Sequence, residues 1–129
     1  MAISYLQHAF GDDFQNLDLP VLGEIEAGKM NILREMISKQ VNSPLTSSLG
    51  RLFDGVAAIC GIRKQVNFEG QAAMEFEMLA VDSTNQMYDY QWVTGESYQL
   101  QTAPIIEGVV ADIQSRVPIA KISAKFHRT

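Results

Sequence analysis

Residues 46–61 read TSSLGRLFDGVAAICG, and this stretch predicts the central helix of the fold. Its apolar residues recur at steps of three and four, the spacing of a helix that packs one side on a core; they are Leu49, Leu52, Phe53, Val56, Ile59 and Cys60. Three hydroxyl residues at 46–48 are candidate N-caps, and Gly61 stands where a left-handed C-terminal residue is expected. We expect a helix of about four turns that follows an extended segment closed by Pro44.

The opposite face of this predicted helix carries Arg51 and Asp54, which are three positions apart and therefore neighbours. Gly50 and Gly55 also lie within the helix, where each costs about 1 kcal/mol relative to alanine. The glycines indicate either close packing against another part of the chain or open space through which a ligand approaches Asp54. For Asp54 itself, the structural alternative to a binding role is a surface ion pair with Arg51, which would stabilise little.

A second stretch, FEGQAAMEFE at residues 68–77, predicts a helix that begins after Gly70. Its inward positions by helical spacing are Ala72, Ala73, Phe76, Leu79 and Ala80. Gln71 and Glu75 are four positions apart and are expected on the opposite side of the helix. A glycine turn that leads into a helix N-terminus is able to bind an anion or a nucleotide, although glycine caps occur on helices of every function.

Both stretches closely resemble the hydrogenase maturation carbamoyltransferase family HypF, and so do the opening MAISYL and the closing AKFHRT. The resemblance covers essentially the whole chain and is densest between Asn42 and Glu77. Members of the family are several times longer than 129 residues, and both ends of this chain look like cuts within a longer protein. The resemblance implies an interior piece of the C-terminal carbamoyl-transfer domain, which belongs to the actin-like ATPase superfamily.

The resemblance also implies which residues bind nucleotide. In the tRNA-modifying relatives of the family, an aspartate four positions after a helix glycine contacts the ribose, and Gly50 with Asp54 matches that pattern. Gly70, Gln71 and Glu75 stand at the positions of a glycine turn and its following acidic residue, although Gln71 replaces the second glycine of the turn. We expect Asp54 and Glu75 to reach solvent at the rim of one groove, because carboxylate oxygens accept hydrogen bonds from ribose hydroxyls.

The activity that the resemblance implies is transfer of a carbamoyl group from carbamoyl-adenylate to the C-terminal cysteine of the partner protein HypE, with ATP as the nucleotide. This chain would supply the nucleoside side of the pocket and no catalytic residue, and it would be inactive alone. A divalent metal ion would be held by segments outside the chain. Two other hypotheses stay open: a small-molecule O-carbamoyltransferase of the same superfamily, and a helical module that docks a partner protein and never contacts nucleotide.

Composition indicates one globular domain over residues 1–129, with 47% hydrophobic and 19% charged residues. A net charge of −5 disfavours nucleic acid as a partner. No apolar run approaches the roughly 18 residues of a membrane span, and no signal peptide is visible. The single cysteine, Cys60, falls on the apolar stripe as a buried thiol and fits a cytoplasmic location. His8 and His127 lie at opposite ends of the sequence, so we expect no metal site from this chain alone.

The complete pattern predicts a mostly α (α+β) fold of about six helices with one small two-stranded antiparallel ribbon. The other helices are expected over Ala2–Phe10, Pro20–Glu26, about Lys29–Lys39, from Thr102 to Pro118, and from Ile119 to the end of the chain. Gly11–Pro20 is expected to be a loop and Asp82–Asn85 a turn. The helices that begin after Thr46 and Gly70 should pack together at the centre.

The ribbon is predicted from alternation. Tyr88, Tyr90 and Trp92 alternate with polar residues, and Tyr98–Gln101 follows after a turn as the second strand. A two-stranded ribbon is marginal alone in water, so we expect it to lie on the helices or on a sheet outside the chain. Exposed apolar faces on the two terminal helices could drive formation of a homodimer.

Overall fold

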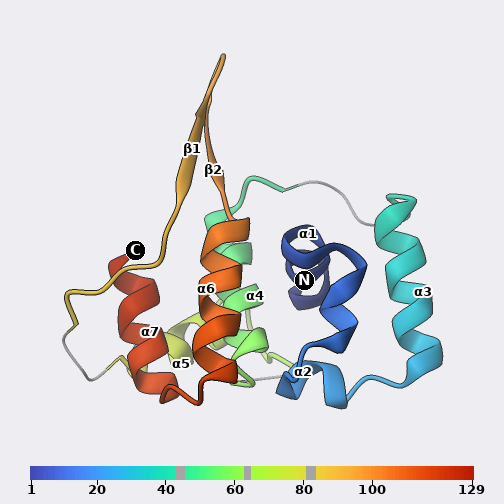
Figure 1. Cartoon of the computed structure of the whole chain (residues 1–129), viewed down its shortest axis with the longest axis horizontal. Coiled ribbons are helices and arrows are strands. Elements are labelled where there is room, and N and C mark those ends of the chain that lie inside the picture. The colour runs from blue at the N-terminus through green and yellow to red at the C-terminus, as the bar shows by residue number, and fades with distance from the viewer. Residues whose placement is uncertain (43–45, 63–64, 81–83) are drawn as a thin grey trace.

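The computed structural model describes residues 1–42, 46–62, 65–80 and 84–129, and most of them are helical (Figure 1). The α-helices are α1 (Ala2–Phe10), α2 (Pro20–Gly23), α3 (Ala27–Ser38), α4 (Leu49–Ile59), α5 (Gln71–Met78), α6 (Ala103–Gln114) and α7 (Ile119–Arg128). The mostly α fold is therefore confirmed. The predicted break at Pro44 and the first half of the turn predicted at Asp82–Asn85 lie outside the described residues.

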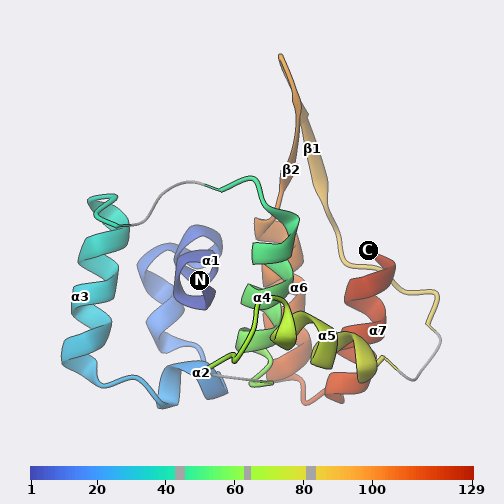
Figure 2. The ribbon, with the colours of Figure 1, turned by 180° about the vertical axis from the view of Figure 1, so that it is seen from behind.

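The core lies where α4 packs against α1, α5 and α6 (Figures 1 and 2). From α4, the side chains of Val56 and Ile59 are fully buried. Phe76 of α5 and Ile106 of α6 are fully buried as well, and each fully buried large apolar side chain contributes roughly 1.5–3 kcal/mol. The predicted packing of the two central helices against each other is thus confirmed.

The two ends of α4 differ from one another in how well the sequence predicts them. Gly61 has a φ of 77°, and the amide of Ile62 donates to the Ala57 carbonyl at 3.0 Å, which confirms the predicted left-handed cap. At the start, Ser48 is the N-cap residue, but its side chain makes no capping hydrogen bond. Leu49 is 58% exposed and was wrongly assigned to the core, because the helix begins at this residue and its first turn projects beyond the packed bundle.

Two more predictions are corrected by the ends of helices. Leu79 is 40% exposed rather than inward, because α5 ends at Met78. Residues 11–16, expected to be a loop, form the 3-10 helix η1 (Gly11–Asn16). This helix carries Phe14 into the core with no exposed surface, and burial of this side chain accounts for the order of the segment.

The ribbon pairs β1 (Gln91–Thr94) with β2 (Tyr98–Gln101) in antiparallel register, with Trp92 opposite Leu100. It projects away from the helices (Figure 1), and the side chains of Trp92 and Tyr98 are 56% and 79% exposed. Of the two predicted supports, the helices are therefore excluded, and a sheet outside the chain stays a prediction. The strand also begins later than predicted, because Tyr88 leaves the alternation and is buried against α6.

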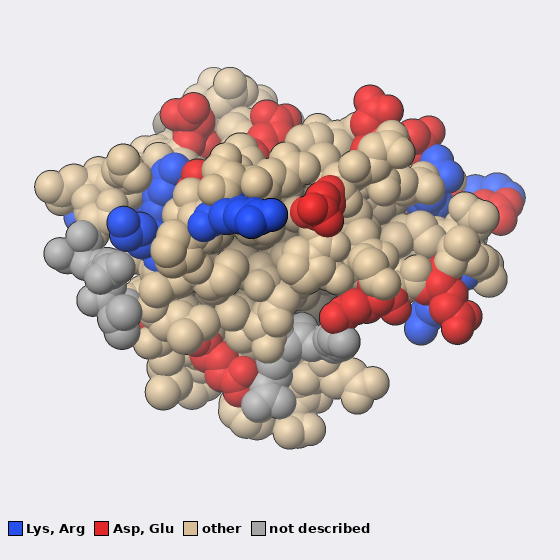
Figure 3. All heavy atoms as spheres, turned by 60° about the horizontal axis from the view of Figure 1, so that its bottom comes forward, with Lys and Arg blue, Asp and Glu red and all other residues tan. Residues whose placement is uncertain are grey.

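The terminal helices bury the apolar faces that were expected to be exposed. Ile3 and Leu6 of α1 and Ile122 and Phe126 of α7 all belong to the core. The stated reason for dimerisation is thus wrong, and a homodimer stays a prediction without that support. On the face in Figure 3, the acidic and basic side chains drawn in colour are interspersed, and the visible cations do not merge into a basic area.

Candidate functional site

Asp54 lies in the second turn of α4 and is partly buried. Its Oδ1 atom is shut off from water and has no hydrogen-bond partner in the part of the chain that the structure describes. Among the described residues, Asp54 forms no ion pair with Arg51, whose Nη1 atom instead lies 3.6 Å from the sulfur of Met1. A buried acceptor without a donor costs about 1–3 kcal/mol, so the fold holds this oxygen at the expense of stability.

Of the two glycines in α4, one is required by close packing and the other borders open space. A Cβ on Gly55 would lie 2.6 Å from the ring of Tyr5, so this glycine is required by packing against α1. A Cβ on Gly50 would meet only the Ser48 hydroxyl, at an ordinary 3.6 Å. Because Gly50 and Asp54 are four positions apart on one helix face, the open space lies directly beside the carboxylate.

The turn before α5 is organised by Gln71. Gly70 has a φ of 79°, and a Cβ there would meet nothing within 4 Å. The Oε1 atom of Gln71 accepts from the Asn67 amide at 2.7 Å, and its Nε2 atom donates to Glu75 Oε1 at 3.1 Å. Gln71 is only 6% exposed, so its predicted position on the open side of the helix is wrong. Helical spacing misplaces it because the side chain folds back over the preceding turn to the Asn67 amide.

These contacts place the predicted site residues on two adjacent helices (Figure 2). Gln71 and Glu75 form one hydrogen-bonded pair on α5, while Asp54 lies on α4 and is not a member of that pair. Asp54 and Glu75 are both partly buried, so each presents part of its side chain to solvent. The backbone amide of Gln71 donates to the Phe68 carbonyl at 3.3 Å, so this amide is already used within the turn. The shared groove stays a prediction.

His127 of α7 lies against both α4 and α5, and the sequence analysis did not predict a role for it. Its ring centroid lies 5.4 Å from those of both Phe53 and Phe76, which belong to α4 and α5. Its Nε2 atom, like the Oδ1 atom of Asp54, is buried without a partner. The only signal in the sequence is its place four residues after Ser123, the spacing at which side chains meet on a helix.

A second polar cluster lies in the bundle, and its side chains pair with one another. Asp112 Oδ2 accepts from the hydroxyl of Tyr88 at 2.8 Å and from Nζ of Lys125 at 3.1 Å. The Lys125 ammonium also lies 4.3 Å from the centroid of the Tyr88 ring. Burial, followed by the hydrogen bond to Asp112, raises the pKa of Tyr88 well above its ordinary value. These contacts connect the segment before β1 with α6 and α7.

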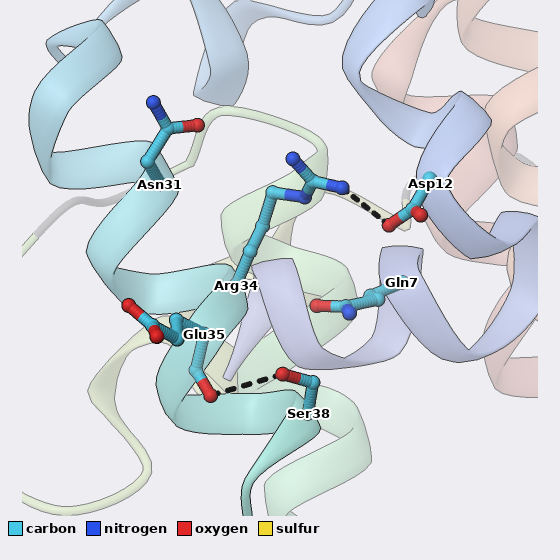
Figure 4. Close-up of a pocket in the computed structure, with 6 residues that line it drawn as sticks. All are labelled: Gln7, Asp12, Asn31, Arg34, Glu35 and Ser38. Atoms are coloured by element: carbon cyan, nitrogen blue, oxygen red, sulfur yellow. Dashed lines mark hydrogen bonds and ion pairs between the residues drawn. The ribbon is translucent and has the colours of Figure 1, made fainter.

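A separate hollow of about 430 Å³ lies between α1, η1 and α3 (Figure 4). It is lined by polar side chains, namely Gln7, Asp12, Asn31, Arg34, Glu35 and Ser38. Arg34 reaches across it to Asp12 at 2.5 Å, and the Ser38 hydroxyl donates to the Glu35 carbonyl at 3.0 Å. The predicted site residues are not among its lining, so the hollow is distinct from the site on α4 and α5.

Other chemistry finds little support in the structure. Cys60 is a buried core residue, as predicted, and burial raises the pKa of its thiol to about 12. Within the described part of the chain, no group of three or more His, Cys, Asp or Glu side chains is arranged to hold a metal ion. No helix in that part has the length and apolar character to cross a membrane.

The comparisons with known proteins cover the whole chain. Residues 1–129 match the family model described as carbamoyltransferase, Kae1-like domain, second subdomain. The chain is 29% identical over its entire length to carbamoyltransferase HypF of Synechocystis sp., of which it spans 18%. It is 40% identical to HypF of Rhodobacter capsulatus over 66% of this chain and 11% of the relative.

A solved structure shares the fold. The crystal structure of full-length HypF in its phosphate- and nucleotide-bound form is similar to this chain with a TM-score of 0.84 and 32% sequence identity. The similarity covers 98% of this chain and 20% of that protein. The chain thus spans about a fifth of the relatives that it matches.

Proposed function

From the premise that this chain belongs to the HypF carbamoyltransferase family, as the second subdomain of its Kae1-like domain, we propose that it forms the nucleoside side of an ATP and carbamoyl-adenylate pocket. The observation that carries the proposal is the Oδ1 atom of Asp54, buried without a partner beside the bare surface of Gly50. A ribose hydroxyl would donate to this oxygen and remove the cost of leaving it unpaired.

The neighbouring turn supports the same assignment. Glu75 is held by Gln71, whose other end is fixed by the amide of Asn67, so its orientation is set before any ligand arrives. Preorganised groups bind more tightly because less conformational freedom is lost on binding. The similar solved structure of HypF is a nucleotide-bound form, which makes a nucleotide the first ligand to test.

In the whole protein, we propose that the carbamoyl group passes from carbamoyl-adenylate to the C-terminal cysteine of a HypE-type partner. The cysteine thiolate forms a C–S bond to the carbamoyl carbon, and the C–O bond to the adenylate phosphate breaks, so AMP leaves with the electron pair. Asp54 and Glu75 would hold the nucleoside so that the reacting carbon stays in place, and neither residue would touch it.

The divalent metal ion that the family resemblance implies does not fit the described residues, because they contain no suitable group of ligands. We therefore expect it to be held by other segments of the protein. On this proposal the present chain is inactive when separated from them, and the reaction takes place in the cytoplasm.

The test is a calorimetric titration of the full-length protein that carries this chain, with ATP, 2′-deoxy-ATP and 3′-deoxy-ATP. We expect Asp54→Asn to weaken ATP binding by about tenfold or more, since hydrogen bonds to charged groups contribute about 1.5–3 kcal/mol. The variant should also bind the matching deoxynucleotide as it binds ATP. Glu107→Gln, which removes an exposed carboxylate from α6, is the matched control.

An unchanged ATP affinity in Asp54→Asn would contradict the proposal. It would favour the alternative in which the chain docks a partner protein without contacting nucleotide. The ribbon would then be the surface of interest, because Trp92 and Tyr98 project from the helices without cover in the described chain. Membership in the HypF family leaves the small-molecule carbamoyltransferase alternative without support.

A further inference from the structure

His127 lies where the helices of the candidate site meet. Its ring contacts Phe53, which precedes Asp54 on α4, and Phe76, which follows Glu75 on α5. Phe126 completes the aromatic group, with its ring 5.0 Å from that of Phe53. The imidazole is therefore fixed by packing at the junction of α4, α5 and α7.

The hydrogen bonds around His127 determine where its proton is. The hydroxyl of Ser123 donates its one proton to the Phe76 carbonyl at 2.5 Å. The Nδ1 atom of His127 lies 2.8 Å from the Ser123 carbonyl, which accepts hydrogen bonds and cannot donate them. It also lies 3.3 Å from the Ser123 hydroxyl oxygen, whose proton is already used. Both contacts require Nδ1 to be the donor, so in the neutral ring Nε2 carries only a lone pair.

This Nε2 atom is buried and has no partner. Buried polar atoms are paired in nearly all native structures, so an exception calls for a physical explanation. Among the described residues, Asp54 Oδ1 is a second such exception and Gln7 Oε1, at the separate hollow, is a third. Asp54 lies on α4, the helix whose Phe53 ring contacts His127. The Asp54 and His127 atoms both accept hydrogen bonds, so a ligand that pairs them must present donors.

We propose that His127 is a further binding residue of the nucleotide pocket, where its Nε2 atom accepts a hydrogen bond from a nucleoside hydroxyl or from the amine of the base. This inference rests on the proposed function. His127 is partly exposed as a residue, and its Nε2 atom is covered by neighbouring side chains. A ligand donor reaches Nε2 once the neighbouring side chains shift, an adjustment that is common at binding interfaces.

Two substitutions distinguish the role of the Nδ1 atom from that of the Nε2 atom. His127→Asn keeps a nitrogen near the position of Nδ1, which can donate to the Ser123 carbonyl, and lacks the acceptor at Nε2. His127→Gln places an amide oxygen near the position of Nε2. In the full-length protein we expect His127→Asn to weaken ATP binding by about 3- to 12-fold, the range of one hydrogen bond, and His127→Gln to restore most of the affinity. A merely structural role would give the opposite order, because only His127→Asn keeps the hydrogen bond to the Ser123 carbonyl.

Analogues of ATP identify which group of the nucleotide donates the hydrogen bond to Nε2. If it is the base amine, purine riboside triphosphate, which lacks this amine, binds His127→Asn and the wild type equally. If it is a ribose hydroxyl, 2′-deoxy-ATP or 3′-deoxy-ATP removes the difference instead. ATP affinity unchanged in His127→Asn but weakened in Asp54→Asn overturns this inference alone. ATP affinity unchanged in Asp54→Asn overturns the proposed function.

Discussion

Two aspartates on neighbouring helices of one core stand in opposite states. Asp112 of α6 accepts hydrogen bonds from Tyr88 and Lys125, and both it and the lysine are 21% exposed. Asp54 of α4 is also partly buried, yet its Oδ1 atom has no partner. The comparison teaches that burial alone does not give a carboxylate its role: Asp112 is paired within the chain, whereas the Oδ1 atom of Asp54 is the one that we propose pairs with a ligand.

The glycine four residues before each aspartate follows the same division. A Cβ on Gly108 would lie 2.5 Å from the ring of Tyr88, so the space at this glycine is already filled. A Cβ on Gly50 would meet no atom closer than 3.6 Å, and the surface beside Asp54 is bare. One region is thus closed by its own side chains, and the other leaves room for a molecule that the chain does not supply.

The largest effect is expected from Asp112→Ala. This change leaves the Tyr88 hydroxyl and the Lys125 ammonium without their shared acceptor, and we expect a loss of about 2–3 kcal/mol in the free energy of unfolding. Urea denaturation measures the loss, and ATP affinity should stay unchanged. A loss below about 0.5 kcal/mol, the range of an ordinary surface substitution, would show that the closed cluster contributes little.

Alanine substitutions at Gly108 and Gly50 should change stability by smaller amounts and in opposite directions. Gly108→Ala overpacks against Tyr88 and should lower stability by about 1–2 kcal/mol, even after the better helix propensity of alanine is included. Gly50→Ala meets no obstacle and should raise stability by up to about 1 kcal/mol. Thermal denaturation of both variants tests the comparison, and equal shifts in one direction would break it. If ligand enters beside Asp54, Gly50→Ala also weakens ATP binding.

The smallest effect concerns alkaline pH. Because burial and Asp112 raise the pKa of Tyr88 in the folded state, the native protein keeps this proton at pH values where the unfolded chain has lost it. Stability from this residue is complete below about pH 10, the ordinary pKa of tyrosine, and falls above it by up to about 1.4 kcal/mol per pH unit. Tyr88→Phe should flatten that decline in urea titrations at several pH values. Parallel curves for both proteins would contradict the assignment.

Local patterns in the sequence predicted what depends on neighbours along the chain. The stripe of residues 46–61 located α4, and Gly61 located its end, because helix spacing and left-handed caps are properties of a few consecutive residues. Such patterns do not predict contacts between segments that are distant in the sequence. Tyr88 was read as a strand residue because its partners Asp112 and Lys125 lie far along the chain.

The candidate site shows the same limit. Asp54 and Glu75 came from a family resemblance, and spacing alone placed Gln71 on the wrong side of α5, since a capping contact depends on where the preceding turn goes. His127 was noted only as one of two separated histidines, although α7 brings its ring against Phe53 and Phe76. Its unpaired nitrogen is visible only when the helices are assembled.

The most direct test of the central claim measures stability and nucleotide affinity together in Asp54→Asn. The unpaired oxygen contributes nothing to the fold, so we predict an unfolding free energy that is unchanged or slightly higher, alongside ATP binding weakened by about tenfold or more. A variant that loses stability as Asp112→Ala does, while it binds ATP as tightly as the wild type, would show that Asp54 belongs to the closed kind of cluster after all.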